Sequence, residues 1–329
     1  MAAERKRGAV MYRQTLSPIL EIFRVVPLDG TPFPEYKAGQ YMALSREDCK
    51  LTRKIVSPEG ELSYVYDTDP EGNVRRGQVT HSYSISSAPF ESRLQKYIEF
   101  YVVLEMIKTE TPGRLSESLF QIDTERDNKL TYVNKITGDF TLEKRAQGFN
   151  NVVLVGTGTG LAPFASMIKE LNYQASQGMR DGVRYTLFHA NRTIAELGFH
   201  RELLDIERAG KIDFVYVPSV SRPTKRDYDD PSIGKGRANN LLRCVVHMPM
   251  KEEEDLASLS GHPEALDRAN ESLRKAVRPV LPGHVTPASV VDRMDPSTTV
   301  VLTCGNPNVM EDIKHIAVAN NMKFEKEDW

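Results

Sequence analysis

One stretch of the chain, NVVLVGTGTGLAPFASMIKEL at residues 151–171, limits the possible folds more than any other. An apolar run leads into a glycine-rich turn, and Pro163 follows where the first turn of a helix would begin. Proline is favoured there because its missing N–H would be unpaired in any case. Phe164, Ile168 and Leu171 then repeat with helical spacing, which gives the helix a buried face. The segment predicts a strand–turn–helix unit of an α/β domain.

The turn itself carries Gly156, Gly158 and Gly160. Glycines let the backbone approach a phosphate closely, and the N-terminus of the following helix offers free N–H groups and a positive dipole end. The spacing is G-x-G-x-G-x-x-P, which differs from the G-x-G-x-x-G of the common NAD-binding fold. The pattern predicts a dinucleotide or anion site, and the alternative is a tight turn without a ligand.

The pattern of apolar and turn residues along the chain changes near residue 150. Between about residues 9 and 145, short β-patterned runs are broken by turn residues, which predicts an antiparallel barrel or sandwich. Beyond that point, apolar strands alternate with helical stretches, which predicts a parallel sheet with helices on its faces. A chain of 329 residues with 40% hydrophobic composition has room for two cores. We therefore expect domains at 1–148 and 149–329.

Two segments look like additions to this plan. Residues 48–79 are polar and rich in turn residues, while residues 246–296 hold a charged helical block followed by a proline-rich loop. Neither shows an internal repeat, and the pattern alone assigns no role to either.

Composition excludes several classes of function. The net charge of −2 gives no general attraction to nucleic acid or anionic membranes, and no apolar run approaches the length of a membrane span. Three widely spaced cysteines and seven scattered histidines predict no metal site and no disulfide framework. The first residues also lack the apolar core of a signal peptide. We expect a soluble protein of the reducing cytoplasm.

Three later strands are each expected to end in polar residues: HANR (189–192), VSR (220–222) and CGNP (304–307). Ligands of open parallel sheets bind beyond the carboxyl ends of the strands, so these segments should converge. The guanidinium group binds phosphate bidentately and keeps its charge. The candidates for an additional phosphate pocket are Arg192, Arg222 and Arg237. For any one of them, a solvated surface charge is the alternative.

A different pattern appears in HSYSISSAP, residues 81–89. In an extended segment Ser82, Ser84 and Ser86 would share one face. Such a polar row predicts a neighbour or ligand that forms hydrogen bonds.

The glycine turn and the three polar strand ends, in this order, resemble the ferredoxin/flavodoxin–NADP reductase family, most closely its bacterial branch. The resemblance covers most of the chain apart from the two additions. It implies an FAD-binding antiparallel β-barrel followed by an NADP-binding α/β domain. It also implies an FAD-dependent oxidoreductase that transfers electrons between NADPH and ferredoxin or flavodoxin, with hydride transfer at flavin N5.

By this resemblance, HSYS corresponds to the family's R-x-Y-S flavin motif. Tyr83 would lie against the isoalloxazine ring and Ser84 would reach flavin N5. His81 stands where the family has an arginine on the FAD pyrophosphate. Neutral histidine brings no charge, which predicts weaker or pH-dependent FAD retention. The arginines that could compensate are Arg75, Arg76 and Arg114.

Other flavin contacts follow from the same resemblance. The family's G-x-L-S segment appears at residues 113–116, Tyr101 matches an aromatic that contacts the flavin nucleotide, and Thr159 would lie near both cofactors. Trp329 matches a terminal tryptophan that stacks on FAD, although Asp328 stands where another aromatic is expected and the acid beside the nicotinamide is not assigned. The implied FAD residues are His81, Ser82, Tyr83, Ser84, Tyr101, Arg114, Leu115, Ser116, Thr159 and Trp329.

The resemblance also implies an NADP site. Ser221 and Arg222 match the pair that binds the 2′-phosphate, which favours NADP over NAD, and Cys304 matches a cysteine beside the nicotinamide. The implied NADP residues are Gly156, Gly158, Gly160, Asn191, Arg192, Ser221, Arg222, Arg237, Cys304, Gly305 and Asn306. The implied catalytic residues are Tyr83, Ser84 and Cys304.

Two alternatives remain open at this point. The same domains serve as the reductase component of an oxygenase or as a general flavin reductase. The changes at His81 and Asp328 would also suit a non-catalytic subunit that docks on a redox complex through residues 246–296. The chain carries no plant-type iron–sulfur motif, so one-electron partners would be separate proteins. The sequence does not assign an oligomeric state.

Overall fold

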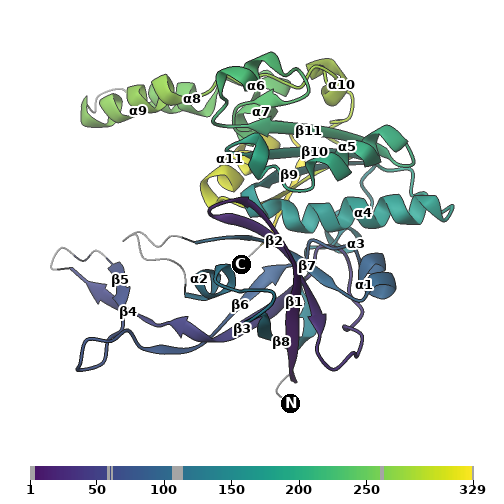
Figure 1. The fold of residues 1–329 in the computed structure, drawn as a ribbon. Helices are drawn as coiled ribbons and strands as arrows, with labels where there is room; N and C mark the ends of the chain where they lie inside the picture. The colour runs from purple at the N-terminus through teal and green to yellow at the C-terminus, as the bar shows by residue number, and fades with distance from the viewer. Residues whose placement is uncertain (1–3, 58–59, 61, 106–113, 260–262, 328–329) are drawn as a thin grey trace. The chain divides into compact units, whose positions relative to one another are not determined.

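The structure is a computed structural model of the chain, and it describes all residues except 1–3, 58–59, 61, 106–113, 260–262 and 328–329 (Figure 1). The chain divides into two compact units, Met1–Asp139 and Phe140–Trp329.

The first unit is built on a six-stranded antiparallel sheet with the order β6-β3-β8-β1-β2-β7. Its apolar side chains form one core in which Phe23, Met42, Phe100 and Tyr132 are buried. Two short helices accompany the sheet. The elements are β1 (Arg5–Ser17), β2 (Leu20–Pro27), β3 (Tyr41–Lys50), β4 (Thr52–Val56), β5 (Leu62–Tyr66), β6 (Arg76–Ser84), α1 (Pro89–Gln95), β7 (Ile98–Val103), α2 (Arg114–Phe120) and β8 (Lys129–Thr137).

The two edge strands of this sheet meet just beyond β6. Ile85 forms an isolated bridge with Phe100 of β7, and the Ser86 N–H donates to the Glu99 carbonyl oxygen at 2.9 Å. Strands at opposite edges can meet only if the sheet curls, so the unit is a partly closed barrel. The predicted antiparallel barrel is confirmed.

The predicted polar addition at residues 48–79 is a β-hairpin. Strands β4 and β5 pair antiparallel from Thr52 opposite Tyr66 to Val56 opposite Leu62. The hairpin continues outward from β3 and β6 (Figure 1), and Val56 and Leu62 at its end are exposed. It lengthens the existing strand pair and adds no separate core.

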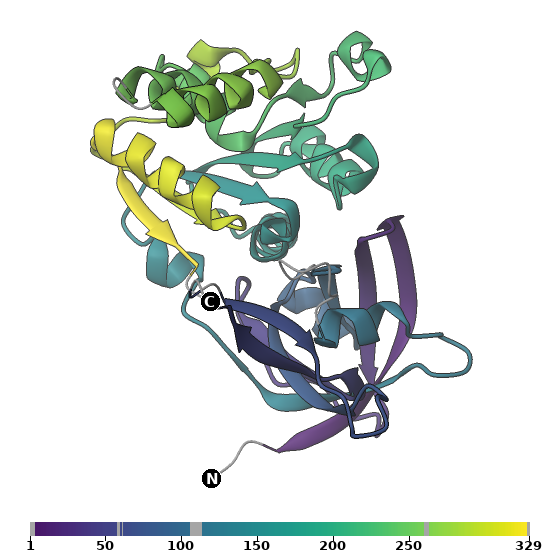
Figure 2. The same cartoon turned by 90° about the vertical axis from the view of Figure 1, so that its left-hand side faces the viewer.

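The second unit is built on a six-stranded parallel sheet with the order β12-β11-β10-β9-β13-β14. The predicted parallel-sheet domain is confirmed, and Figure 2 shows helices on both sides of its strands. The elements are α3 (Leu142–Arg145), β9 (Asn151–Thr157), η1 (Gly158–Leu161), α4 (Ala162–Ser176), β10 (Arg184–Asn191), η2 (Ile194–Glu196), α5 (His200–Ala209), β11 (Asp213–Val220), α6 (Lys225–Asp229), β12 (Gly234–Lys235), α7 (Ala238–Val245), α8 (Lys251–Ser258), α9 (Pro263–Lys275), α10 (Pro287–Val291), β13 (Thr299–Cys304), α11 (Pro307–Ala319) and β14 (Lys323–Lys326).

The division between the units falls earlier in the chain than the boundary expected at residue 148. Phe140 packs on Phe164 of α4, with ring centroids 5.8 Å apart, and Arg145 of α3 lies 2.9 Å from Glu325 of β14. These contacts attach residues 140–148 to the second unit. Residues 140–148 form no clear strand or helix pattern, so their sequence does not indicate that they belong to the second unit.

The expected addition at residues 246–296 is partly integral to the second unit. Val285, Val290 and Met294 are buried in the core that α7 and α11 share with the sheet. Helices α8 and α9 pack on one another and project from this core (Figure 1). In the part of the chain that the structure describes, no helix is long and apolar enough to cross a membrane.

Candidate functional site

The glycine turn has the geometry that the sequence predicts. Strand β9 ends at Thr157, the 3-10 helix η1 follows, and α4 begins with Pro163 in its first turn. Gly158 adopts a φ of +56°, and no heavy atom lies within 4 Å of the position a Cβ would take. An open, left-handed glycine backbone at a helix entrance is available to a ligand.

Two other predicted glycines serve the packing of strand ends. A Cβ on Gly160 would lie 2.2 Å from the Cys304 carbonyl oxygen, and a Cβ on Gly305 would lie 2.3 Å from Thr157 Oγ1. Gly305 also has a φ of +127°. Their lack of a side chain lets the ends of β9 and β13 come together. Their contact with a nucleotide stays a prediction, as does that of the buried Gly156.

The carboxyl ends of β9, β10, β11 and β13 open into one cleft of about 1240 Å³. This is the convergence predicted from the polar strand ends, since parallel strands end at the same edge of the sheet. The lining includes these predicted NADP residues: Gly158, Asn191, Arg192, Ser221, Arg222, Arg237 and Asn306. Gly156, Gly160, Cys304 and Gly305 are not part of the lining.

The loops after β10 and β11 are tied together at the cleft. The Ser221 N–H donates to the Asn191 carbonyl oxygen and the Arg222 N–H to that of Arg192, both at 2.9 Å. The Asn191 side chain donates to the Glu196 carbonyl oxygen at 2.7 Å. Strand pairing thus continues past the sheet edge and places Arg192 beside Arg222.

The three predicted phosphate-binding arginines differ in their surroundings. Arg192 pairs with Glu196 through Nε at 2.9 Å and also through Nη2, and Glu196 is buried. Arg237 lies 3.3 Å from the buried Glu252. Among the described residues, the Arg222 side chain has no ion-pair or hydrogen-bond partner. Its charge is therefore the least compensated of the three.

Cys304 ends strand β13 and lies outside the cleft lining. Its thiol donates to Glu327 Oε2 at 2.9 Å, and both residues are buried. Burial raises the pKa of the Cys304 thiol well above its usual value, and the Glu327 carboxylate raises it further. The thiol is therefore neutral, which suits a packing role and excludes a reactive thiolate.

Sequence reasoning did not find Glu327. The chain offers three acids close together near its end, and the local pattern does not choose among them. The pairing of β14 with β13 determines which acid reaches Cys304. Thr303 lies opposite Lys326, and the Glu327 N–H donates to the Thr303 carbonyl oxygen at 3.1 Å. Glu327 is thereby carried to Cys304, while Glu325 pairs with Arg145.

In the first unit, HSYS lies at the end of the edge strand β6. His81 and Ser82 are exposed, Tyr83 is partly buried and Ser84 is buried. The Tyr83 ring meets Phe100 edge-on at 6.5 Å, and burial raises the pKa of its phenol. An edge strand bearing an aromatic ring and hydroxyls fits a flavin in the chemistry of its donors, although no arginine stands at position 81.

The expected polar row of serines is not continuous. Strand β6 ends at Ser84, so the alternation does not continue to Ser86. Ser82 is exposed, whereas Ser86 is buried and its hydroxyl has no hydrogen-bond partner among the described residues. Ser87 has a structural role, because its Oγ accepts from the Glu99 N–H at 3.0 Å.

Most of the remaining predicted FAD residues are buried or form contacts within the protein. Tyr101 and Leu115 are buried, at 3% and 1% exposure. The Ser116 hydroxyl accepts from the Glu105 N–H at 3.1 Å. Arg114 begins α2 and Thr159 lies in η1, both partly exposed. Trp329, Asp328 and Gly113 lie outside the described residues.

The arginines expected to compensate for His81 are engaged elsewhere. Arg75 lies 3.8 Å from Asp67, and Arg76 donates to the Asp48 carbonyl oxygen at 2.8 Å. Both contacts belong to the base of the β4–β5 hairpin. Arg114 is therefore the one of the three for which no such contact is seen within the described part of the chain.

The chain is similar to known oxidoreductases in sequence. Residues 154–271 match the model of the oxidoreductase NAD-binding domain. The ferredoxin–NADP reductase of Azotobacter vinelandii is 25% identical over 209 residues, covering 59% of this chain and 71% of that protein. The one of Pseudomonas aeruginosa is 26% identical over 206 residues, covering 58% and 70%. A Bacillus subtilis flavohemoprotein is 24% identical over 226 residues, covering 68% of this chain but 45% of that protein.

Solved structures share the fold over nearly the whole chain. A ferredoxin NADP⁺ reductase from Neisseria gonorrhoeae, with bound FAD and NADP, superposes with a TM-score of 0.58 at 17% identity and covers 98% of this chain and 99% of that one. The FAD/NAD-binding domain of a Vibrio cholerae nitric oxide dioxygenase gives a TM-score of 0.57 at 15% identity, with 98% of each chain covered.

A barrel unit followed by a parallel-sheet unit with a cleft at its strand ends defines a two-domain nucleotide-binding oxidoreductase. The chain is similar to ferredoxin–NADP reductases in sequence and fold, and residues 154–271 match the oxidoreductase NAD-binding domain.

Proposed function

We propose that this protein is an FAD-dependent oxidoreductase that transfers electrons between NADPH and a one-electron carrier protein, ferredoxin or flavodoxin. The observation that supports it most is the cleft formed by four strand ends, with Ser221 and the uncompensated Arg222 on its lining. Similarity to the Azotobacter and Pseudomonas reductases supports the carrier class.

The cleft suits a dinucleotide in three respects. Gly158 leaves room for close backbone approach. Helix α4, of 15 residues, begins just beyond it and presents the positive end of its dipole to an anion. Arg222 brings a charge that a 2′-phosphate can pair with and a 2′-hydroxyl cannot. We propose that NADP(H) binds here in preference to NAD(H).

Bound FAD would supply hydride exchange at N5 and the release of single electrons. We propose that Tyr83 packs against the flavin ring as a neutral phenol and that Ser84 offers its hydroxyl to the flavin. Cys304 and Glu327 contribute a neutral, hydrogen-bonded wall at the end of β13. The pair lies outside the cleft lining, and we propose that it supports the nicotinamide end of the cleft from behind that lining.

We further propose a reducing, cytoplasmic location. Cys49, Cys244 and Cys304 are all free, and two of them are buried, where oxidation would disrupt packing.

Anaerobic reduction tests the function. Purified protein is supplemented with FAD, and the flavin absorbance is followed while NADPH or NADH is added. Reduction by NADPH at a much lower concentration than by NADH supports the proposal. Flavin that binds and stays oxidised would favour the non-catalytic subunit, which keeps the fold without the reaction.

A second candidate is the reductase component of an oxygenase or a general flavin reductase. Similarity to the Bacillus flavohemoprotein favours it, as does a shared fold with a cytochrome P450 reductase from Amycolatopsis, at a TM-score of 0.56. Titrating the NADPH-reduced protein with ferredoxin, flavodoxin, free flavin and a haem acceptor distinguishes these possibilities by the acceptor that reoxidises it fastest.

A further inference from the structure

Helices α8 and α9 form one wall of the nucleotide cleft. The sequence assigned no role to the segment that contains them, yet it supplies a large share of the charged groups around the cleft. The lining residues from these helices are Lys251, Glu252, Glu254, Asp255, Ser272 and Lys275. Each lysine is paired within its own helix, Lys251 with Asp255 and Lys275 with Glu271. The wall therefore adds little free positive charge.

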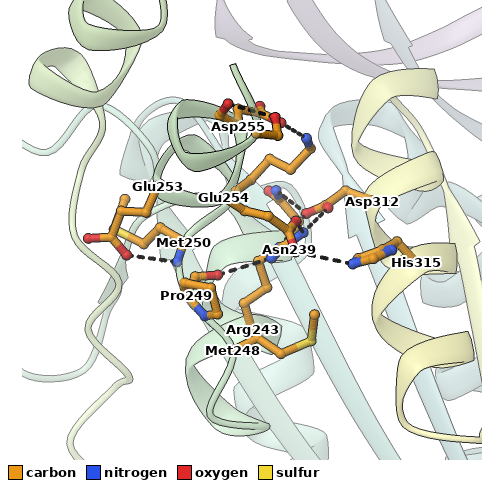
Figure 3. A network of polar contacts seen from close by, with 12 residues as sticks. Asn239, Arg243, Met248, Pro249, Met250, Glu253, Glu254, Asp255, Asp312 and His315 are labelled. Atoms are coloured by element: carbon orange, nitrogen blue, oxygen red, sulfur yellow. Dashed lines mark hydrogen bonds and ion pairs between the residues drawn. The ribbon is translucent and has the colours of Figure 1, made fainter. Parts of the chain in front are cut away.

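A buried ion network fixes α8 against α7 and α11 (Figure 3). Arg243 of α7 has no exposed surface; its Nη2 lies 2.5 Å from Asp312 Oδ1 of α11 and 2.6 Å from Glu254 Oε2 of α8. Its Nη1 donates to the Pro249 carbonyl oxygen at 3.0 Å. The hydrogen bond from Arg243 lowers the pKa of Glu254, so this carboxylate stays charged and the network stays intact. Helix α8 thus presents a fixed face to the cleft.

Asn240 orients the first turn of α8. Its Oδ1 accepts from the Lys251 N–H at 3.0 Å, and its Nδ2 donates to Glu252 Oε2 at 2.8 Å. The Glu252 side chain is only 8% exposed. Because one carboxylate oxygen is held by Asn240, the other is directed at a defined neighbour.

That neighbour is Arg237, one of the predicted phosphate-binding arginines. Its Nη1 lies 3.3 Å from Glu252 Oε1, and its side chain is 63% exposed at the cleft. A phosphate that reaches this guanidinium must share it with a carboxylate that is fixed in place and cannot move away. Like charges held close together oppose binding, and the opposition is stronger where solvent is partly excluded.

We propose that Glu252 is a specificity-determining residue that acts through Arg237 and lowers the preference of the cleft for a 2′-phosphate over a 2′-hydroxyl. The inference rests on the proposed function, because it assigns the cleft to an adenine dinucleotide. Helix α8 then sets how strongly the protein discriminates between NADPH and NADH. Without the carboxylate, Arg237 adds its full charge to that of Arg222.

Calorimetric titration of the full chain with adenosine 2′,5′-bisphosphate and with AMP tests this. Glu252→Gln keeps the side-chain shape and an oxygen for Asn240 but removes the charge. We expect the variant to bind the bisphosphate about three- to tenfold more tightly, with AMP affinity unchanged within about twofold. A merely structural role would alter both nucleotides together.

Two further variants sharpen the result. Asp205→Asn makes the same change in net charge at an exposed residue paired with Arg208 at 3.5 Å on α5, and it should leave both affinities unchanged. In an Arg237→Ala background, Glu252→Gln should gain less than about twofold, because the partner through which it acts is gone.

The outcomes separate the inference from the proposed function. If the parent protein fails to bind the bisphosphate more tightly than AMP, the proposed NADP cleft is wrong and the inference falls with it. If the parent discriminates but Glu252→Gln binds the bisphosphate no better, the inference alone is overturned. A full gain that persists without Arg237 also overturns it.

Discussion

The Cys304 thiol and the Glu327 carboxylate lie 2.9 Å apart in the interior of the second unit, and the thiol is the donor. Glu327 is one of the causes that hold the pKa of Cys304 high. The pair explains why the thiol at the end of β13 should not react as a nucleophile.

We therefore expect Cys304 to resist thiol reagents in the native protein, with Cys244, which is partly exposed, reacting first. Glu327→Gln should lower the pKa of Cys304 and speed its modification severalfold, because it removes the nearby negative charge. Timed alkylation with peptide mass spectrometry measures both rates. The same modification rate for Cys304 in the parent and the variant would argue against the assigned hydrogen bond.

Arg222 should dominate recognition of the 2′-phosphate. It is the arginine of the cleft whose charge is not balanced by a partner among the described residues, and charged hydrogen bonds contribute about 1.5–3 kcal/mol. Arg222→Ala should reduce the preference for NADPH over NADH by about 10- to 100-fold, and Arg222→Lys should retain part of it. The ratio of kcat/KM for the two nucleotides is the measurement.

Variants of Arg192 should behave differently from variants of Arg222. Arg192→Ala removes a charged partner of the buried Glu196, so we expect loss of stability as well as of nucleotide affinity. An Arg192 variant that changes selectivity more than Arg222→Ala, at unchanged stability, would contradict this ranking.

The buried His189 should make the stability of the second unit sensitive to acid. Burial lowers the pKa of His189 to about 3, and its Nδ1 lies 2.9 Å from the Tyr216 hydroxyl. The pKa of His189 is lower in the folded protein than in the unfolded chain, where it is near 6.5. The contribution of the neutral histidine to folding stability is therefore fully present above pH 6.5 and is lost as the pH falls toward 3. The loss should be on the order of 4 kcal/mol in the free energy of unfolding.

Urea unfolding between neutral and acid pH measures this slope. His189→Phe should flatten it, whereas His247→Asn, at an exposed position, should leave it unchanged. An equal slope in the parent and His189→Phe would show that other groups cause the acid sensitivity. Other titrating groups face this site, because His200 also approaches the Tyr216 hydroxyl at 3.3 Å.

His81 should weaken the hold on FAD. The residue is exposed on β6, where a permanently charged arginine would pair with a pyrophosphate. His81→Arg should lower the FAD dissociation constant by about tenfold or more, because it adds a charged donor that can pair with the pyrophosphate. Fluorescence titration of the apoprotein with FAD tests it, with Gln95→Arg, at an exposed position of α1, as a control for the added charge. Unchanged affinity in His81→Arg would place the pyrophosphate elsewhere.

Much of the fold and of the nucleotide cleft could be predicted from local patterns. Apolar strands followed by polar residues reveal the carboxyl edge of a parallel sheet, and for this reason Arg192 and Arg222 were expected together. Ion pairs over long sequence distances leave no such signal. Neither Glu252, which lies on a helix outside the repeating pattern, nor Glu327, which depends on strand register, could be assigned to its partner in advance.

The errors have similar causes. The serine row fails because β6 ends at Ser84, and strand ends depend on tertiary closure at Ile85 and Phe100. The nucleotide contacts of Gly160 and Gly305 stay predictions, and the structure shows a packing reason for both glycines where two strands meet. A glycine pattern indicates that another group comes close to the backbone, but it does not distinguish a ligand from a neighbouring strand.

The central claim is that the cleft at the strand ends binds NADPH for flavin reduction. The most direct measurement is the anaerobic rate of flavin bleaching in the FAD-loaded protein at matched concentrations of NADPH and NADH. We predict rapid bleaching with NADPH, much slower bleaching with NADH, and loss of that difference in Arg222→Ala. Equal rates with both nucleotides in the parent protein, or bound flavin that neither reduces, would contradict it.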